Sequence, residues 1–272
     1  MSLGIWLYLD RLLPGLLNQT RRDSGRTKGP ILVTRRAYWG EPVQTQSVRP
    51  TSIESTSRGR GAYLACKRGV DTALAGLLLA LASPLLLLIA LGIRLDSPGP
   101  VLLRQTRVGR GGRAFTCYKF RTMVSNADPE LHRRYMCSFI RNQAPAAPGD
   151  TADAAPFKLV NDPRVTRTGR ILRSTSLDEM PQLLNVLRGD MSLVGPRPAL
   201  PYEVEEYETW HRHRLDVLPG LTGWWQVYGR SRVSFDEMVR MDLEYIAHQS
   251  LALDIKLILL TVPVVVLRKG AR

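Results

Sequence analysis

The sequence predicts an α/β membrane-associated fold, in which an N-terminal re-entrant membrane helix precedes a compact domain of mixed helices and short strands with interfacial helices. The first observation behind this prediction is an uncharged run of 22 residues, from Thr72 to Ile93, in a chain of 272 residues. The second is the alternation of short apolar runs with helical patterns after it. We therefore divide the chain into a basic extension (1–62), a membrane segment (63–96) and a larger domain (97–272).

Basic residues lie on both sides of the uncharged run. As one helix the run would be about 33 Å long, enough to cross the core of a bilayer. Because basic residues mark the cytoplasmic side of a membrane segment, both ends favour the same side, which a re-entrant segment satisfies and a crossing helix does not. A kinked crossing helix and a buried helix of a soluble protein are the alternatives. The flanking basic residues are Arg58, Arg60, Lys67, Arg68, Arg94, Arg104, Arg107, Arg110 and Arg113.

Ser83 and Pro84 interrupt the uncharged run near its middle. Pro84 has no backbone donor and its ring clashes with the carbonyl of Ala80, which costs a helix interior about 3 kcal/mol. A break here leaves arms of about 18 Å and about 14 Å, long enough for a shallow hairpin and too short for a crossing. The Ser83 hydroxyl can satisfy a carbonyl released near the bend. We therefore expect the elbow of the re-entrant segment at Ser83-Pro84.

The N-terminal extension combines two compositions. Residues 3–17 carry apolar side chains at helical spacing, which predicts a short amphipathic helix, and residues 18–60 are polar and basic, which predicts disorder. Over the whole chain, 38 Lys and Arg against 24 Asp and Glu give a net charge of +14. This excess predicts an anionic partner, either nucleic acid, a phosphorylated metabolite or an acidic membrane surface. The three cysteines indicate neither a disulfide framework nor a zinc site.

The domain after the membrane segment opens with two short strands around a Gly-rich turn at 109–112. An apolar stretch at 257–267 is too short to span a bilayer and either lies on the membrane or completes the core. We expect His211 and His213 to be surface residues of a polar helix rather than a metal-binding pair. Short apolar runs and helices are expected over 177–187, 191–194, 202–218 and 235–248.

The segment 170–198 holds the densest group of reactive side chains. Ser176 and Glu179 fit a capping box, in which the serine side chain bonds the glutamate amide. Pro181 argues that the helix begins no earlier than about Asp178. Either way, the adjacent carboxylates of Asp178 and Glu179 stand at a helix N-terminus, where free amides favour anions.

Arginines accompany this acidic pair. Arg170 and Arg173 precede it, and Arg197 lies between two prolines that restrict its backbone. Guanidinium groups suit bidentate phosphate binding. Carboxylates among arginines either form plain salt bridges or hold a divalent metal on a phosphate, and Mg²⁺ takes one or two carboxylates plus substrate phosphates.

From Lys67 to its end the chain resembles the bacterial sugar transferase family, the monotopic phosphoglycosyl transferases that act on polyprenyl phosphate. The motifs that carry this resemblance are KRGVDTALAGLLLALASPLLLL, YKFRTM, NDPRVTRTGRILRSTSLDEMPQLLNVLRGDMSLVGPRP and LPGLTGWWQVYGR. The resemblance implies transfer of a sugar 1-phosphate from a UDP-sugar to undecaprenyl phosphate, with UMP as the other product. This is the first membrane step of polysaccharide or glycan synthesis.

The resemblance also implies roles for individual residues. Asp178 would be the nucleophile that forms a covalent phosphosugar intermediate, and it would contact Mg²⁺. Glu179 would act as a base or orienting acid for the lipid phosphate, and Ser83-Pro84 would be the family's re-entrant break. The residues expected to bind substrate or phosphate are Lys119, Arg121, Arg173, Arg197 and Asp254.

The partners implied are a UDP-sugar, undecaprenyl phosphate and membrane lipid, with Mg²⁺ as cofactor, no nucleic acid, and a homodimer as one option. The catalytic domain (97–272) would face the cytoplasm from the inner membrane. Two other readings stay open. One is a non-catalytic, membrane-anchored basic module that binds acidic lipid or nucleic acid through its charge of +14. The other is a catalytically silent family member that assists a partner enzyme.

Overall fold

The chain divides into two compact units, Met1–Glu54 and Ser55–Arg272. In the first unit, β1 (Ile31–Thr34) and β2 (Thr45–Val48) pair as antiparallel strands inside the extension that the sequence predicts to be largely disordered. The amphipathic helix expected at 3–17 lies outside the described residues. The computed structural model describes residues 31–34, 45–48, 57–124, 130–141, 164–229 and 233–266.

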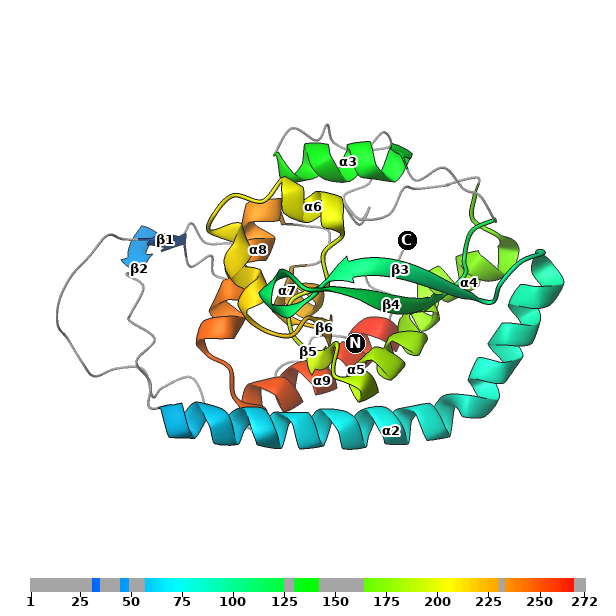
Figure 1. Ribbon diagram of the computed structural model, residues 1–272, viewed down its shortest axis with the longest axis horizontal. Coiled ribbons are helices and arrows are strands. Elements are labelled where there is room, and N and C mark those ends of the chain that lie inside the picture. The colour runs from blue at the N-terminus through cyan, green and yellow to red at the C-terminus, as the bar shows by residue number, and fades with distance from the viewer. Residues whose placement is uncertain are drawn as a thin grey trace, which may run out of the picture. The chain divides into compact units, whose positions relative to one another are not determined.

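In the second unit, the uncharged run forms part of one long helix, α2 (Ser57–Asp96). Figure 1 shows α2 bending between a longer N-terminal arm and a shorter C-terminal arm, and proline is the commonest cause of a sharp helix bend. The expected break at Ser83-Pro84 is wrong in one respect, because the helix continues through Pro84. The Ser83 hydroxyl donates a 2.8 Å hydrogen bond to the carbonyl oxygen of Ala80, which Pro84 deprives of its usual backbone donor.

The surface of α2 is strongly apolar. Among the described residues it is the one helix long and apolar enough to cross a membrane, and 11% of its apolar stretch is buried. A core helix of a soluble protein would not expose so many large apolar side chains. The exposed leucines of the stretch are Leu77, Leu78, Leu81, Leu85, Leu87, Leu88, Leu91 and Leu95.

A β-hairpin follows α2, as the sequence predicts. Its elements are β3 (Leu102–Val108), the 3₁₀ turn η1 (Arg110–Gly112) and β4 (Ala114–Phe120). Gly111 and Gly112 have φ angles of 67° and 75°, which favour glycine over any residue with a Cβ. In the antiparallel register Leu103 lies opposite Lys119, so these two side chains share one face of the hairpin.

Short helices and a pair of parallel strands complete the second unit. The element expected over 235–248 is confirmed as a helix, whereas 202–218 is divided into two short helices by a loop. The strands β5 and β6 run parallel. The elements are α3 (Glu130–Ile140), α4 (Arg167–Thr175), η2 (Leu177–Gln182), α5 (Leu183–Arg188), β5 (Ser192–Val194), α6 (Pro201–Glu205), η3 (His211–Asp216), β6 (Gly220–Thr222), α7 (Trp224–Tyr228), α8 (Phe235–Ala247) and α9 (Leu251–Val266).

A small core joins the C-terminal arm of α2 to the hairpin and to η2. It consists of the buried side chains of Ile89, Ile93, Phe120 and Leu172, with Val101 and Leu177 packed against them. Leu177 immediately precedes the acidic pair, so the same core holds the apolar arm and the turn that carries Asp178 and Glu179. The main core, by contrast, packs α5, β5, α8 and α9 against the N-terminal arm of α2.

Helix α9 has two apolar faces. One face is buried and completes the main core, which confirms one of the two roles left open for this stretch. The other face is apolar and exposed, as is the surface of α2. The buried face carries Leu257, Leu260 and Val264, and the exposed face carries Ile255, Leu259 and Val262.

Candidate active site

Glu179 is paired with two cationic side chains. Lys119 Nζ donates to Glu179 Oε1 at 2.8 Å, and Arg197 Nη1 donates to the same oxygen at 3.3 Å. Asp178 precedes Glu179 in the first turn of η2 and is partly exposed. The structure thus brings residues that the sequence singled out to one place from β4, η2 and the loop after β5.

The turn before the acidic pair has an uncommon backbone. Ser176 has a φ of 58°, in the left-handed region, and its amide donates to the Leu172 carbonyl at the end of α4. The Glu179 amide donates to the backbone oxygen of Ser176 at 3.3 Å, and the serine side chain makes no capping bond. The expected capping box is therefore wrong, because Ser176 closes α4 instead of adopting the extended conformation of an N-cap. As a result η2 begins at Leu177.

Helix α4 sits very close to the chain that follows β4. Thr166 caps α4 by accepting a hydrogen bond from the Gly169 amide at 3.0 Å, and the Thr166 amide donates to the Thr122 carbonyl at 3.0 Å. A Cβ atom on Gly169 would lie 2.1 Å from the Thr122 oxygen, so this approach requires glycine. The close contact fixes the position of Arg173, in the last turn of α4.

The backbone around Arg197 is held on both sides. The Gly220 amide donates to the Pro196 carbonyl at 2.7 Å, and Arg107 Nη1 donates to the Pro198 carbonyl at 2.8 Å. The two prolines already restrict the loop, as the sequence predicts. These hydrogen bonds add a second restraint, so Arg197 is presented to Glu179 from a fixed backbone.

Arg107 is a site residue that its sequence position does not distinguish from the other basic residues after the uncharged run. Its buried guanidinium donates to Gln105 Oε1 from Nε at 3.1 Å and from Nη2 at 2.7 Å, in addition to its bond with Pro198. The alternation of side chains along a strand could have identified Arg107, because residues two apart point to the same face. Given a hairpin turn at 109–112, Gln105 and Arg107 fall on the face that carries Lys119.

His132 on α3 lies within reach of the arginines. Its Nδ1 is 2.9 Å from the Tyr202 hydroxyl. Burial, followed by the positive charges of Arg107, Arg197 and others, lowers the pKa of His132 to about 4. The other contributing charges are those of Arg173 and Arg164. Arginines from β3, α4 and the loop after β5 therefore create one positive field, in which a neutral histidine sits.

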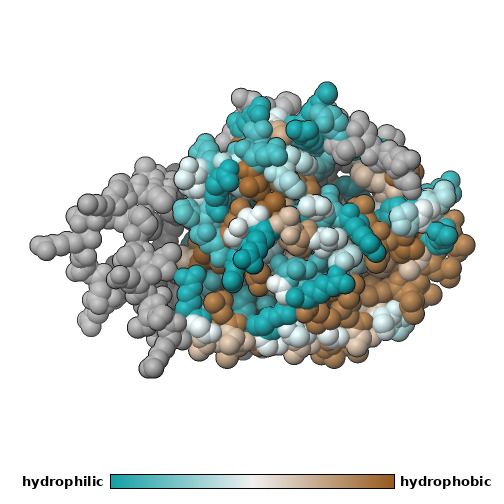
Figure 2. Space-filling model, in the orientation of Figure 1, coloured by the Kyte–Doolittle hydropathy of each residue, from teal (hydrophilic) through white to brown (hydrophobic). Residues whose placement is uncertain are grey.

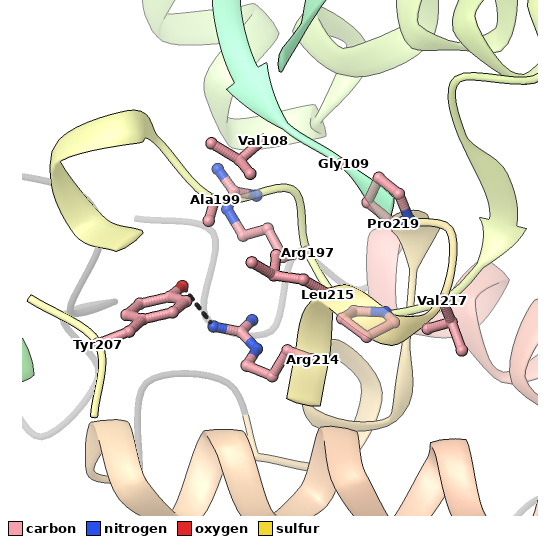
Figure 3. A pocket seen from close by; sticks show the side chains of 10 residues that line it. Val108, Gly109, Arg197, Ala199, Tyr207, Arg214, Leu215, Val217 and Pro219 are labelled. Atoms are coloured by element: carbon pink, nitrogen blue, oxygen red, sulfur yellow. Dashed lines mark hydrogen bonds between the residues drawn. The ribbon is translucent and has the colours of Figure 1, made fainter. Parts of the chain in front are cut away.

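A buried ion pair shares a small cavity with Arg197. A cavity of about 10 Å³, room for one water molecule, is lined by Arg197, Tyr207 and Arg214 among others. Figure 3 shows these side chains, with the 2.9 Å bond from Arg214 to the Tyr207 hydroxyl drawn as a dashed line. Arg214 also donates to Asp242 Oδ2 at 2.8 Å. The cavity is too small for a substrate, so its walls act as structure rather than as a binding pocket.

His211, which we expected at the surface, is buried. Its ring packs among Tyr207, Trp210 and Phe235, and its Nε2 lies 3.4 Å from Asp236 Oδ1. The expectation was wrong because η3 is a short 3₁₀ segment that turns this residue inward against α8.

Two of the expected substrate-binding residues make other contacts. Arg121 donates to the carbonyl oxygens of Ser97 and Pro98 and so caps the C-terminal end of α2. Asp254 accepts hydrogen bonds from Lys67 at 2.8 Å and from Tyr245 at 2.7 Å. These partners of Asp254 lie on α2 and α8, and substrate binding by Arg121 and Asp254 stays a prediction.

The acidic pair fits Mg²⁺ only together with a phosphate. No group of three or more His, Cys, Asp and Glu side chains suited to a metal occurs within the described part of the chain. Magnesium does not need one, since it takes one or two carboxylates and completes its octahedron with phosphate oxygens and water. Asp178 meets this requirement as a partly exposed carboxylate next to a cation-rich surface.

The arrangement suits phosphate chemistry. Two cations contact Glu179, the neighbour of Asp178, and the turn that carries both carboxylates packs on the small core that also holds the apolar arm of α2. Guanidinium and ammonium groups stabilise phosphate charge, and a carboxylate can attack phosphorus.

Comparisons with known proteins agree with this chemistry. The chain is 40% identical to the exopolysaccharide production protein ExoY of Sinorhizobium fredii over 85% of this chain and 93% of that protein. It is 46% identical to the UDP-glucose:undecaprenyl-phosphate glucose-1-phosphate transferase of Caulobacter vibrioides, over 72% of this chain and 68% of that protein. It is 43% identical to the undecaprenyl-phosphate galactose phosphotransferase of Salmonella typhimurium, over 75% of this chain.

The relatives differ in length. The chain spans 41% of the Salmonella protein and 44% of a galactosyl transferase, CpsE, from Streptococcus agalactiae. The family model described as bacterial sugar transferase matches residues 62–268, from the N-terminal arm of α2 to the end of α9. This chain therefore belongs to the bacterial sugar transferase family and is an enzyme of that family.

Proposed function

We propose that the protein transfers a sugar 1-phosphate from a UDP-sugar to undecaprenyl phosphate, giving undecaprenyl-diphosphate-sugar and UMP. The observation that carries the proposal is the Asp178-Glu179 pair, with Glu179 bound to Lys119 and Arg197, on a turn that packs on the same small core as the apolar arm of α2. The printed names of the Caulobacter and Salmonella relatives support the lipid acceptor. The name of ExoY supports a role in exopolysaccharide synthesis.

In the proposed mechanism Asp178 is the nucleophile. Its carboxylate oxygen attacks the sugar-bearing phosphorus, the bond from that phosphorus to the bridging oxygen breaks, and UMP leaves with the bridging oxygen. An oxygen of the lipid phosphate then attacks the same phosphorus, and the Asp178 carboxylate is released unchanged. A covalent intermediate of this kind divides one difficult displacement into two easier ones. Glu179 orients the lipid phosphate or accepts its proton.

The basic side chains would hold the diphosphate. Lys119, Arg173 and Arg197 offer fixed positive charge where negative charge develops, and the restrained backbone of Arg197 lowers the cost of reorganisation. Mg²⁺ bound through Asp178 would neutralise charge on the diphosphate. Arg107 would act as a positioning residue, because its hydrogen bond holds the loop of Arg197.

We further propose that α2 enters the inner membrane from the cytoplasmic face and returns at the elbow of Ser83-Pro84. Exposed leucines on both arms and basic residues near both ends support this path. It would hold the acidic pair at the membrane surface, where a water-soluble UDP-sugar meets a lipid phosphate. Nucleic acid has no part in this reaction, and a homodimer stays a prediction.

The first test is UMP release. Purified protein with Mg²⁺, undecaprenyl phosphate and a panel of UDP-sugars should release UMP, and Asp178→Asn should lower the rate about 10³-fold or more. Asp216→Asn, which changes an exposed carboxylate on η3, is the matched control and should keep the wild-type rate. Full turnover by Asp178→Asn would show that another residue is the nucleophile. No UMP from any sugar, together with steep salt-dependent binding to DNA, would favour the basic binding module.

A further inference from the structure

The first residues of β3 expose leucine on both faces of the strand. Leu102 is 37% exposed and Leu103 is 45% exposed. Successive residues of a strand point to opposite faces, so both faces of the strand are partly exposed at this point. An open hollow of about 510 Å³ lies here, and its lining is Pro100, Val101, Leu102, Leu103 and Arg104.

The hollow adjoins the apolar arm of α2. Val101, in its wall, packs on the core that contains Ile89 and Ile93, and its carbonyl accepts a hydrogen bond from the Arg121 amide at 2.9 Å. Figure 2 shows hydrophobic surface gathered on the side of this unit where the C-terminal arm of α2 and the start of β3 lie in Figure 1. The exposed side chains of the arm are Leu85, Leu87, Leu88, Leu91 and Leu95.

One lining residue of the hollow pairs across the hairpin with a residue of the candidate site. Leu103 is directly opposite Lys119 in the hairpin register, and the Cβ atoms of such a pair lie about 5 Å apart. Lys119 Nζ is in turn bound to Glu179. Leu103 in the lining therefore stands beside a cation that contacts the acidic pair, and Arg104, on the opposite face of the strand, adds a second positive charge to the lining.

We propose that this hollow binds the isoprene units next to the phosphate of the lipid acceptor, with Leu103 as the side chain that sets their position. The proposal rests on the proposed function for the identity of the lipid. Apolar walls and a cation at one end match a ligand with an apolar chain and an anionic head, and burial of the chain stabilises it in proportion to the area removed from water. The nucleotide sugar, which is polar throughout, does not match walls of leucine, valine and proline.

The test uses the full-length chain and two soluble acceptors. Geranyl phosphate has two isoprene units, and methyl phosphate has none. Because geranyl phosphate needs no bilayer, its advantage over methyl phosphate reports contact near the reacting phosphate. We expect Leu103→Ala to raise the KM for geranyl phosphate about tenfold, since it removes most of one apolar contact. The KM for the UDP-sugar and for methyl phosphate should not change.

The matched control is Leu259→Ala on α9, which removes the same group from an exposed apolar position, 60% accessible, outside the hollow. It should leave every KM at the wild-type value. An unchanged KM for geranyl phosphate in Leu103→Ala, or an equal rise in both variants, would show that the hollow does not bind the isoprene units. The proposed function would still stand.

A second measurement does not depend on turnover. A benzophenone derivative of geranyl phosphate should label residues 100–104 on irradiation, and excess geranyl phosphate, but not methyl phosphate, should compete. Leu103→Ala should lower this labelling about tenfold, and Leu259→Ala should not. If no UDP-sugar releases UMP but this labelling occurs, the proposed function fails and isoprenoid binding stands. Labelling elsewhere in the chain would show that the isoprene units do not bind in the hollow.

Discussion

The Ser83 hydroxyl donates a 2.8 Å hydrogen bond to the carbonyl oxygen of Ala80. That carbonyl is the one that loses its helical donor to Pro84, and in hydrocarbon an unsatisfied carbonyl costs several kcal/mol. The serine therefore allows proline to bend α2 without leaving a bare polar group on an apolar surface. The bend and the hydrogen bond together would supply the elbow of the proposed re-entrant path.

The first prediction concerns the path of α2. If the helix is re-entrant, single cysteines at Arg60 and Arg110 should both react from the cytoplasmic side, because both chain ends then lie on that side. The measurement is labelling by a membrane-impermeant maleimide before and after permeabilisation, in a chain whose accessible native cysteines, Cys66 and Cys137, are replaced by serine. Labelling of the two positions from opposite sides would make Ser83-Pro84 a kink in a crossing helix.

The second prediction concerns Gln105, which bonds Arg107 through two hydrogen bonds. Gln105→Leu leaves two buried donors of Arg107 without their acceptor, so we expect the loop of Arg197 to lose order and the KM for the UDP-sugar to rise about tenfold. Gln105→Glu keeps the acceptor oxygens and should restore the KM. A change confined to thermal stability, with the KM unaltered in both variants, would mean that Arg107 is structural only.

The matched control for Gln105 is its strand neighbour Thr106, which is exposed on the opposite face of β3. Thr106→Leu alters the strand locally without touching Arg107. It should leave the KM for the UDP-sugar at the wild-type value.

The third prediction is a pH dependence of stability from His132. Its pKa falls from 6.5 to about 4 on folding, so the unfolded state binds more protons between these values. The contribution of His132 to stability is therefore complete above about pH 6.5 and is lost as the pH falls toward 4. His132→Gln should remove this loss. The measurement is the free energy of unfolding in urea at several pH values from 4 to 7.

Asp242 has the opposite effect to His132 on the pH dependence of stability, in the same pH range. Burial raises the pKa of this carboxyl from 3.8 to about 6, although Arg214 opposes the shift. Its contribution to stability is complete below pH 3.8 and is lost as the pH rises through 6. In His132→Gln the free energy of unfolding should therefore decrease as the pH rises from 4 to 6, because the effect of Asp242 is no longer opposed. A profile identical to that of the wild-type protein would contradict the neutral state of His132.

Local chemistry explains what the sequence predicted. The hairpin follows from glycines that accept positive φ, the restrained Arg197 follows from its two prolines, and the bend of α2 follows from Pro84. Each of these depends on residues within a few positions of one another. For the same reason Asp178 and Glu179 could be placed at the start of a helical turn from the sequence alone.

Contacts between distant parts of the chain could not be predicted in this way. Arg107 and Pro198 are 91 positions apart, and their bond depends on how the hairpin meets the loop after β5. His211 is buried because α8 covers η3. The polar residues around His211 in the sequence give no indication of this contact. Ser176 has a φ of 58° because it ends α4 directly before η2 begins. Its position between two helices therefore overrides the usual preference of serine for the N-cap.

The last prediction tests how α4 positions the acidic pair. A methyl group on Gly169 would meet the Thr122 oxygen at 2.1 Å, and backbone atoms cannot move aside as a side chain can. Gly169→Ala should therefore lower the free energy of unfolding by about 3 kcal/mol and displace α4 from the chain after β4. Because Ser176 joins α4 directly to η2, the displacement should also lower the rate of UMP release.

Gly92 in α2 is the matched control for Gly169, since an added methyl group there would lie 3.8 Å from the Thr168 side chain, an ordinary contact. Gly92→Ala should raise helix stability by about 0.5–1 kcal/mol and keep the wild-type rate. Thermal unfolding and UMP release measured on both variants separate the two cases. Equal stability and activity for the two alanine variants would mean that α4 can shift without moving Asp178, and that the close approach at Thr122 does not position the site.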